Sequence, residues 1–318
     1  MASTVNFLAA SRRWNPRGSR VAKVANATAR TSSFGLTGSS VTTPQLSQKF
    51  CSAPKSEQLR LSSGASARTS FSARNRRVKV LASWGKDVEW FEASVSEISK
   101  ASSMIWNLKL DVGPISEGYT KPGQFVQAKV GDSKPGFFAI ASPPARDNND
   151  YGKLQLLVKA QGGTAELLCK LSPGEKVEVS PVMGKGFPVE RLQPPSEFPT
   201  VLLFATGSGI SPVKALIESG ALEPSKRSNV TLYFGASDKE AMACKELFEG
   251  WAKMGVSVVP VLSSDGKGYV QDVFASSGGV SSGQGVGAVL CGQKEMATAI
   301  RQSLTAAGVP EDCILTNF

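Results

Sequence analysis

The sequence predicts two folded domains of different class, an antiparallel β-barrel followed by an α/β domain with a parallel, Rossmann-like sheet. Two observations predict this order. Residues 87–192 contain six short strand-like segments separated by turn residues, and residues 198–318 contain apolar strands that alternate with helical segments. A proline-rich stretch separates the two patterns and places the boundary near residues 190–198. At 318 residues the chain has room for about two domains of ~150 residues each.

The elements of the predicted barrel follow one another closely. One helical segment, TAELLCKL (Thr164–Leu171), interrupts six strands, several of which alternate apolar and polar residues. Closely spaced strands of this kind are typical of a small antiparallel barrel. The predicted strands are WFEASVSEIS (90–99), MIWNLKLDV (104–112), GQFVQAKV (123–130), GFFAIAS (136–142), KLQLLVKA (153–160) and KVEVSPV (176–182).

The second half repeats a strand and helix pair. Continuous apolar runs indicate strands buried on both faces, and such strands joined by helices indicate a parallel sheet. The predicted strands are TVLLFAT (200–206), NVTLYFGAS (229–237), VSVVPVLS (256–263) and GAVLCGQ (287–293). The predicted helices are SPVKALIESGAL (211–222), DKEAMACKELFEGWAKMG (238–255) and KEMATAIRQSLTAAG (294–308).

The positive net charge of +10 is concentrated at the N-terminus. Residues 1–86 hold 15 Lys and Arg against the single acid Glu57, which leaves 21 basic and 25 acidic side chains in residues 87–318. The predicted folded part is therefore mildly acidic, and a nucleic-acid partner is not expected.

Residues 1–82 have the composition of an organelle transit peptide, rich in Ser, Ala and Arg and poor in acids, and we expect them to be disordered. The stretch NRRVKVLAS (75–83) resembles a plastid processing site, so we predict import into the chloroplast stroma. Mitochondrial import and a disordered basic tail with its own binding role are the competing interpretations. No apolar run is long enough to predict a transmembrane segment.

Several chemistries are excluded by composition. The chain contains no histidine, which removes His-dependent catalytic triads and His-bound metals. The four cysteines after the basic segment lack the spacing of zinc or iron–sulfur sites, so no metal site is expected. Whatever the chain catalyses must therefore rely on a cofactor. These cysteines are Cys169, Cys244, Cys291 and Cys313.

The turn after the first apolar strand of the second half is a candidate phosphate-binding site. Glycines 207 and 209 would let backbone amides approach a pyrophosphate at the start of the following helix, and Pro212 suits the first turn of that helix. An ordinary tight turn explains the same residues equally well, and a third glycine is absent. Two further strands also end in small residues, GAS (235–237) and CGQ (291–293), which together would form a ledge for a dinucleotide.

From about residue 90 onward the chain resembles the ferredoxin–NADP reductase superfamily, in particular its plastid-targeted plant members. Eight short signatures occur in family order: KPGQFV (121–126), FFAIAS (137–142), GGTAELL (162–168), GEKVEVSPVMGKGF (174–187), TGSGISP (206–212), LYFGAS (232–237), GYVQDVF (268–274) and CGQKEM (291–296). The resemblance implies an FAD-binding β-barrel domain over residues 87–192 and an NAD(P)-binding domain over residues 198–318.

The resemblance also implies roles for individual positions. Residues of the FAD site would be Phe138, Ala139, Ile140, Ala141, Ser142, Gly162, Gly163 and Thr164. Residues of the NADPH or NADH site would be Thr206, Gly207, Ser208, Gly209, Pro212, Gly235, Ala236, Ser237 and Gly292, with Lys267 and Tyr269 beside the extra phosphate of NADPH. Catalytic positions would be Cys291, near the carbon that releases the hydride, and Phe318, which would cover the flavin. For Phe318 a frayed chain end, and for Lys267 and Tyr269 a solvated loop, are the alternatives.

One motif departs from the family. Where many members carry Arg-x-Tyr-Ser before IAS, this chain has Gly136, Phe137, Phe138 and Ala139, so the arginine for the flavin pyrophosphate and two hydroxyls are missing. Lys134 could supply a cation, but it cannot reproduce a bidentate arginine.

The predicted function is a flavin-dependent oxidoreductase that passes a hydride between NAD(P)H and FAD and then reduces a separate, unidentified acceptor. The main alternative is a non-catalytic nucleotide- or flavin-binding protein on the same fold. A subunit that is active only within a complex is the second alternative.

Overall fold

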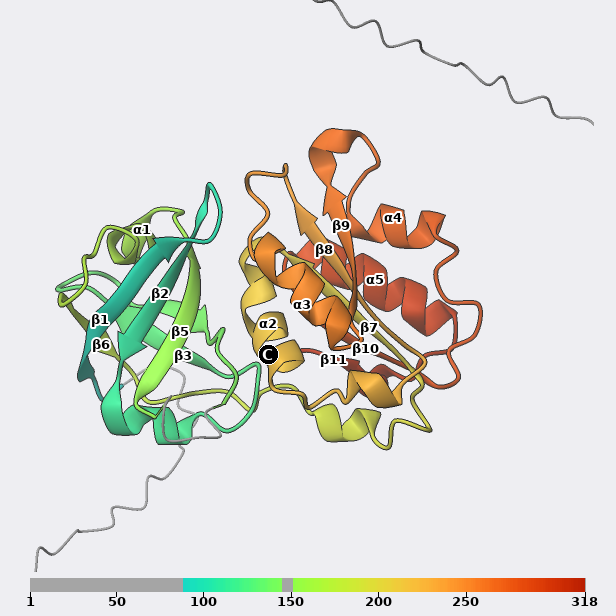
Figure 1. Ribbon diagram of the computed structural model, residues 1–318, viewed down its shortest axis with the longest axis horizontal. Coiled ribbons are helices and arrows are strands. Elements are labelled where there is room, and N and C mark those ends of the chain that lie inside the picture. Colours follow the sequence, from blue (N-terminus) through green and yellow to red (C-terminus); the bar gives the residue numbers. More distant parts are fainter. Residues whose placement is uncertain (1–87, 145–150, 318) are drawn as a thin grey trace, which may run out of the picture. The chain divides into compact units, whose positions relative to one another are not determined.

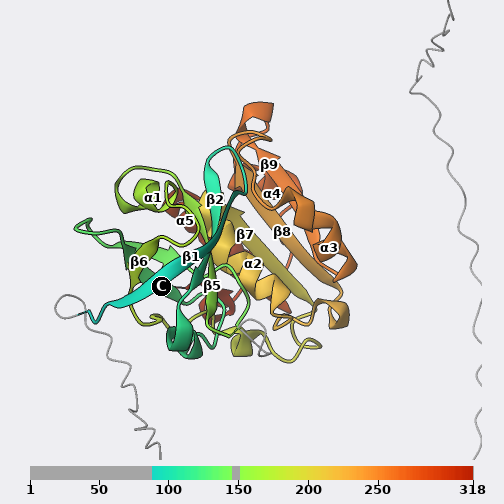
Figure 2. The ribbon, with the colours of Figure 1, turned by 60° about the vertical axis from the view of Figure 1, so that its left-hand side comes forward.

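The computed structural model describes residues 88–144 and 151–317. All of these residues belong to one compact unit of the chain, Arg74–Phe318. The predicted transit peptide (1–82) and Phe318 lie outside the described residues, so these two predictions stay untested. Figures 1 and 2 show two views of the ribbon.

The first half is an antiparallel sheet of six strands in the order β4-β3-β6-β1-β2-β5. The strands β1, β2 and β5 run side by side in both views (Figures 1 and 2). The alternation of apolar residues that predicted them fills the interior with Val95, Leu108 and Leu156, which are almost completely buried. The strands are β1 (Phe91–Lys100), β2 (Ile105–Asp111), β3 (Phe125–Lys129), β4 (Gly136–Ala139), β5 (Lys153–Lys159) and β6 (Lys176–Val179).

The two edge strands of this sheet meet each other directly after β4. Ile140 forms an antiparallel bridge with Leu156, and the amide of Ala141 donates a hydrogen bond of 2.7 Å to the carbonyl of Gln155. This contact joins the edges of the sheet, as the prediction of a barrel requires. The short helix α1 (Gly163–Leu168) follows β5, close to the predicted 164–171, and buries Leu168 in the barrel core.

The second half is a parallel sheet of five strands in the order β11-β10-β7-β8-β9. Its edge strand β9 contains Pro260, which is tolerated there because an edge strand does not need every amide for pairing. The short fifth strand, β11, was not predicted. The strands are β7 (Thr200–Thr206), β8 (Asn229–Ala236), β9 (Ser257–Leu262), β10 (Val286–Cys291) and β11 (Ile314–Leu315).

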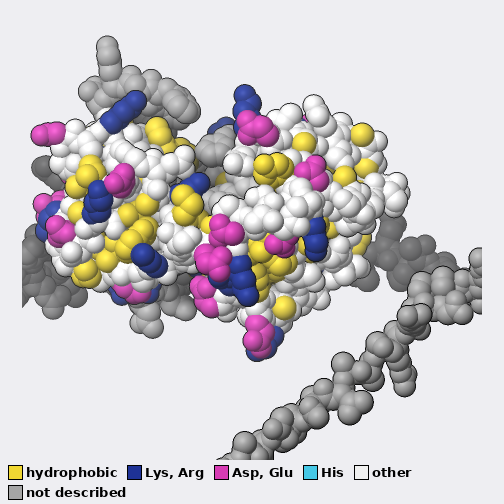
Figure 3. Space-filling view, turned by 90° about the horizontal axis from the view of Figure 1, so that it is seen from above, with side chains coloured by type: hydrophobic (Ala, Val, Ile, Leu, Met, Phe, Trp, Pro, Cys, Tyr) yellow, Lys and Arg dark blue, Asp and Glu magenta, His cyan; other side chains and the backbone are white. Residues whose placement is uncertain are grey.

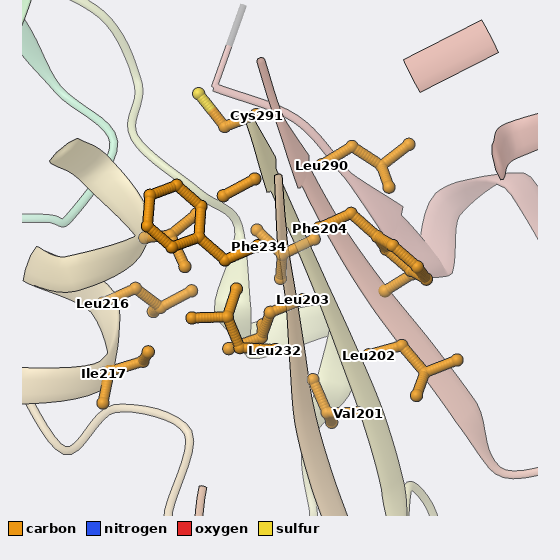
Figure 4. Close-up of a cluster of buried hydrophobic side chains, with 14 of the residues drawn as sticks. Val201, Leu202, Leu203, Phe204, Leu216, Ile217, Leu232, Phe234, Leu290 and Cys291 are labelled. Carbon is orange, nitrogen blue, oxygen red and sulfur yellow. The ribbon is translucent and has the colours of Figure 1, made fainter. Parts of the chain in front are cut away.

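Helices cover both faces of this sheet. In Figure 1, α2 (Ile210–Glu218) and α3 (Phe248–Lys253) lie on one side, and α4 (Val270–Ser276) and α5 (Lys294–Ala306) on the other. Figure 4 shows the core between α2 and the sheet, where Leu216 and Ile217 of the helix face Phe234. Leu202 and Phe204 point away from α2 to the opposite face of the sheet (Figure 4). Burial on both faces explains why these strands read as continuous apolar runs.

The predicted helix 238–255 is wrong in its first half. Only a 3-10 turn (Lys245–Leu247) and α3 are helical. The carboxylate of Asp238 accepts a hydrogen bond of 2.7 Å from the amide of Ala241, and Cys244 adopts a left-handed conformation with φ of 59°. A residue in the left-handed conformation interrupts a right-handed helix, so the helix starts later than the apolar pattern predicts.

The connection between the two sheets is held by the buried side chain of Arg227. Its guanidinium donates hydrogen bonds to the carbonyls of Leu222 (2.6 Å), Phe198 (2.6 Å) and Leu192 (2.8 Å). Burial lowers the pKa of this guanidinium, and the three carbonyls accept from three of its five N–H groups. The chain between residues 192 and 198 is therefore tied to the second sheet, which fits a boundary in this stretch.

Candidate functional site

A cavity of about 1030 Å³ lies between the barrel and the carboxyl ends of the parallel strands. Residues from both halves line it. Thirteen of the predicted site residues are among them: Phe138, Ala139, Thr206, Gly207, Ser208, Gly209, Pro212, Gly235, Ala236, Ser237, Tyr269, Cys291 and Gly292. The volume is at the upper end of the range of known ligand pockets.

On the parallel-sheet side of the cavity, the ends of β7, β8 and β10 and the turn after β7 pack closely against one another. Strand register places Thr206 of β7 beside Gly235 of β8, and Cys291 of β10 beside the residue before Thr206. A Cβ atom on Gly209 would lie 2.3 Å from the Cys291 carbonyl oxygen, and one on Gly292 would lie 2.1 Å from Thr206 Oγ1. These positions accept only glycine because the three strand ends touch. The expected ledge of small residues is present.

The turn after β7 leads directly into α2. Gly207 has a φ of 54°, in the left-handed region, and a Cβ there would meet nothing within 4 Å. Its absent side chain therefore leaves open space beside the cavity. Pro212 lies in the first turn of α2, where a missing amide costs no helical hydrogen bond. The amide of Ile210, the first residue of this nine-residue helix, donates to the carbonyls of the preceding 3-10 turn, Gly207–Gly209.

Cys291 lies at the end of β10 with its side chain almost completely buried. Burial raises the pKa of its thiol to about 12, so the group is a neutral thiol at physiological pH. The next turn is fixed by Thr206, whose hydroxyl oxygen accepts a hydrogen bond of 2.8 Å from the amide of Gln293. This contact joins the end of β7 to the start of α5.

The wall on the barrel is built from aromatic side chains. Phe125 and Phe137 make an edge-on contact with ring centroids 5.8 Å apart, and Phe137 is 58% exposed. The ring of Phe138 lies over Gly136, where a Cβ would come within 2.8 Å of it. An arginine at position 136 would therefore require this ring to move.

The predicted flavin segment 138–142 is divided at Ala139, where β4 ends. Phe138 and Ala139 line the cavity, whereas Ile140 and Ala141 are completely buried and do not. Ser142 is engaged on the barrel: its carbonyl accepts the Tyr119 hydroxyl at 2.7 Å, and its hydroxyl accepts the Gln155 amide at 3.2 Å. Burial raises the pKa of Tyr119, which keeps this hydroxyl a donor.

Four other predicted residues do not line this cavity. Thr164 is buried, and its hydroxyl donates to the Lys134 carbonyl and lies 3.0 Å from Ser133 Oγ. It is thus engaged within the barrel, and its assignment to a pyrophosphate stays a prediction. The others are Gly162, Gly163 and Lys267.

Among the polar residues of the cavity wall that were not predicted, two have a buried oxygen without a partner among the described residues. Asn317 is 4% exposed, and its side-chain nitrogen donates to the Gly123 carbonyl at 3.4 Å. Its side-chain oxygen and that of Gln271 are buried without a hydrogen-bond partner among the described residues. Buried acceptors of this kind are normally paired, so they fit a ligand that brings hydrogen-bond donors. Gln271 lies within the signature GYVQDVF, whereas no motif marks Asn317.

Charge and metal chemistry add little to this site. Within residues 88–144 and 151–317, no group of His, Cys, Asp and Glu could hold a metal ion. Acidic and basic side chains are interspersed on the face shown in Figure 3, without a field of one sign. None of the helices in the described ranges combines the length and apolarity needed to cross a bilayer.

Comparisons with known proteins agree with this architecture. The oxidoreductase NAD-binding domain family matches residues 203–302. Fruit protein pKIWI502 of Actinidia deliciosa is 34% identical over 233 residues, which cover 70% of each chain. The electron transfer subunit of dihydroorotate dehydrogenase B (NAD(+)) from Desulforamulus reducens is 26% identical over 158 residues, or 50% of this chain and 57% of that subunit.

The fold is shared with solved structures. A ferredoxin NADP+ reductase from Neisseria gonorrhoeae, solved with bound FAD and NADP, superposes with a TM-score of 0.56 at 15% identity. The match covers 73% of this chain and all of that chain. Three findings lead to one conclusion: the antiparallel barrel, the parallel sheet whose strand ends line a cavity shared with the barrel, and the relative at 34% identity. The chain belongs to the ferredoxin–NADP reductase superfamily.

Proposed function

We propose that the protein is a flavin-dependent oxidoreductase that passes a hydride between NAD(P)H and FAD and delivers electrons to a separate acceptor. The observation that carries the proposal is the cavity itself, in which small strand ends on one wall face aromatic rings on the other. Two planar ring systems could meet there face to face.

The residues present fit a flavin ring better than the rest of FAD. Phe125, Phe137 and Ala139 give an apolar wall, and the unpaired Asn317 oxygen could accept a hydrogen bond from a ring N–H group. When bound, the flavin accepts a hydride and can release electrons one or two at a time. The protein would orient the rings and exclude water, and the neutral Cys291 thiol would pack beside them without giving up its proton.

The nucleotide site is proposed at the ends of β7, β8 and β10. The left-handed turn at Gly207 and the first turn of α2 would hold the pyrophosphate. Tyr269, 61% exposed in the cavity wall, could cover the outer part of the nucleotide. Lys267 would favour NADPH only if its side chain reaches the site, so the choice between NADPH and NADH is an outcome of the experiment below.

Absorbance spectroscopy of the purified full chain tests the proposal. We expect visible flavin absorbance that bleaches when NADPH or NADH is added without oxygen, and the faster reductant identifies the preferred nucleotide. A colourless protein that cannot be reconstituted with FAD would contradict the proposal. That result would instead support a non-catalytic binding protein, an alternative favoured by the engaged hydroxyl of Thr164 and the missing side chain at Gly136.

We also propose that residues 1–82 direct the protein to the chloroplast. The support is their composition, with one acid among the first 86 residues, and the similarity to a plant protein. A fluorescent protein fused after residue 86 should enter plastids. Import into mitochondria would favour the competing interpretation.

A further inference from the structure

The ammonium group of Lys214 is buried between α2 and the barrel. The residue is 7% exposed and lies one turn after the start of α2. This helix follows β7, whose end is part of the proposed nucleotide site. Burying an unpaired ammonium costs several kcal/mol. Such a group therefore needs a full set of acceptors.

Lys214 has three acceptors for its three protons. They are the carboxylate of Glu218 at 2.7 Å, the side-chain oxygen of Gln155 at 3.0 Å and the backbone carbonyl of Ala141 at 3.3 Å. Glu218 is on α2 itself, whereas Gln155 is on β5 of the barrel and Ala141 follows β4. The lysine thus bridges the two sheets.

The acceptors are themselves held in place. Gln155 donates from its side chain to Asn107 at 2.7 Å, and its backbone carbonyl accepts the Ala141 amide at 2.7 Å. The other oxygen of Glu218 accepts a hydrogen bond of 3.3 Å from the indole of Trp251. The network therefore connects β2, β5, α2 and α3 through side chains with fixed partners.

A second residue of α2 repeats the contact one turn earlier. The hydroxyl of Ser211 donates to the carbonyl of Ala139 at 2.8 Å. Residues three apart lie on one face of a helix, so Ser211 and Lys214 present two donors to the carbonyls of Ala139 and Ala141. These carbonyls belong to the segment that closes the barrel and that carries the proposed flavin contacts.

We propose that Lys214 is a positioning residue that sets the distance between the predicted flavin segment 138–142 and the proposed nucleotide site at the ends of β7, β8 and β10. The proposal rests on the proposed function. Helix α2 begins just after β7 and donates hydrogen bonds to the carbonyls of Ala139 and Ala141. The position of α2 therefore determines how the flavin and nicotinamide rings meet. A misplacement of about 1 Å can slow a reaction on the order of a hundredfold.

The test compares Lys214→Met with Lys253→Met. Lys253 makes the same i,i+4 ion pair, with Glu249 at 2.8 Å, but the two side chains are 74% and 81% exposed. We expect Lys214→Met to lower the rate of flavin reduction by NAD(P)H by about ten- to a hundredfold, with the nucleotide dissociation constant changed by less than about threefold. Lys253→Met should match the wild type in both measurements.

A second measurement uses protein freed of flavin. Hydrogen exchange at the Ala141 amide should be at least about tenfold faster in Lys214→Met than in the wild type and unchanged in Lys253→Met, because the lysine restrains this segment. If Lys214→Met does not fold, the double variant Lys214→Met/Glu218→Gln removes the unpaired carboxylate and takes its place in both measurements.

The outcomes separate the two proposals. A wild-type protein that binds no flavin contradicts the proposed function, and unchanged exchange at Ala141 then contradicts the role of Lys214 independently. The positioning role would be overturned if the wild type is active and Lys214→Met reduces the flavin equally fast. It would also be overturned if Lys214→Met is slower only because it binds the nucleotide more weakly.

Discussion

The two walls of the cavity are built in different ways. On the parallel sheet the wall is built around glycines, because a Cβ atom on Gly209, Gly235 or Gly292 would come within 2.7 Å of a neighbouring atom. On the barrel the wall is side chains, with the exposed ring of Phe137 at its surface. Strand register fixes the positions of the glycines, and these positions tolerate no larger residue. Side chains at the barrel wall can be replaced without loss of the fold.

The largest effect is expected from Gly209→Ala. The new Cβ would lie 2.3 Å from the Cys291 carbonyl oxygen and 2.8 Å from the Gly292 Cα, and neither backbone atom can move alone. We expect a loss of about 3 kcal/mol of unfolding free energy, measured by urea titration, together with weaker NAD(P)H binding.

The matched control is Gly250→Ala in α3, where a Cβ would meet nothing within 4 Å. Alanine should stabilise this helix position by roughly 0.5–1 kcal/mol. A Gly209→Ala protein as stable as the wild type would mean that the strand ends are not in close contact.

A smaller and more selective effect is expected from Phe137→Ala on the barrel wall. The ring is 58% exposed and contacts Phe125 edge-on, so the unfolding free energy should fall by less than about 1 kcal/mol. The flavin dissociation constant should nevertheless rise about tenfold, the equivalent of one lost contact of about 1.4 kcal/mol. Fluorescence titration with flavin measures this change.

Tyr151→Ala provides the comparison, because Tyr151 is an exposed barrel aromatic that does not line this cavity. It should leave flavin affinity unchanged. Equal losses in the two variants would show that the effect of Phe137 is general to the barrel.

The smallest effect at physiological pH concerns Cys291. Burial raises the pKa of its thiol from about 9 to about 12, so the folded state favours the protonated form. Because the unfolded chain loses this proton first, the contribution of Cys291 to the unfolding free energy should be constant below pH 9 and fall as the pH rises toward 12.

The measurement is urea unfolding between pH 7 and 11 for the wild type and Cys291→Ala. Cys244 has a similarly raised pKa of about 12, so the variant should show a shallower decline rather than none. A decline equally steep in both proteins would remove Cys291 as its cause.

Sequence reasoning predicted most of the small strand ends that line the cavity and only part of the rest of its wall. The small residues at positions 207, 235 and 292 follow apolar strands in chain order, and parallel strands bring their carboxyl ends to one edge of a sheet. Asn317 carried no comparable signal. Its neighbour Gly123 is 194 residues away, and no local pattern predicts a contact over that distance.

The error over residues 238–247 has a local cause that periodicity does not capture. Apolar spacing predicted a helix, but the left-handed backbone at Cys244 interrupts it, and α3 begins only at Phe248. Hydrophobic patterns describe which face of a helix is buried and do not reveal where the backbone leaves the helical conformation.

The sequence by itself determined the order of strands and helices, because side-chain periodicity and turn residues act between near neighbours. It also determined which strand ends are small enough to touch. Only the tertiary structure decided which polar groups meet across the barrel and the sheet. Lys214 reaches acceptors 59 and 73 residues away, and such partners are selected by the packing of whole elements.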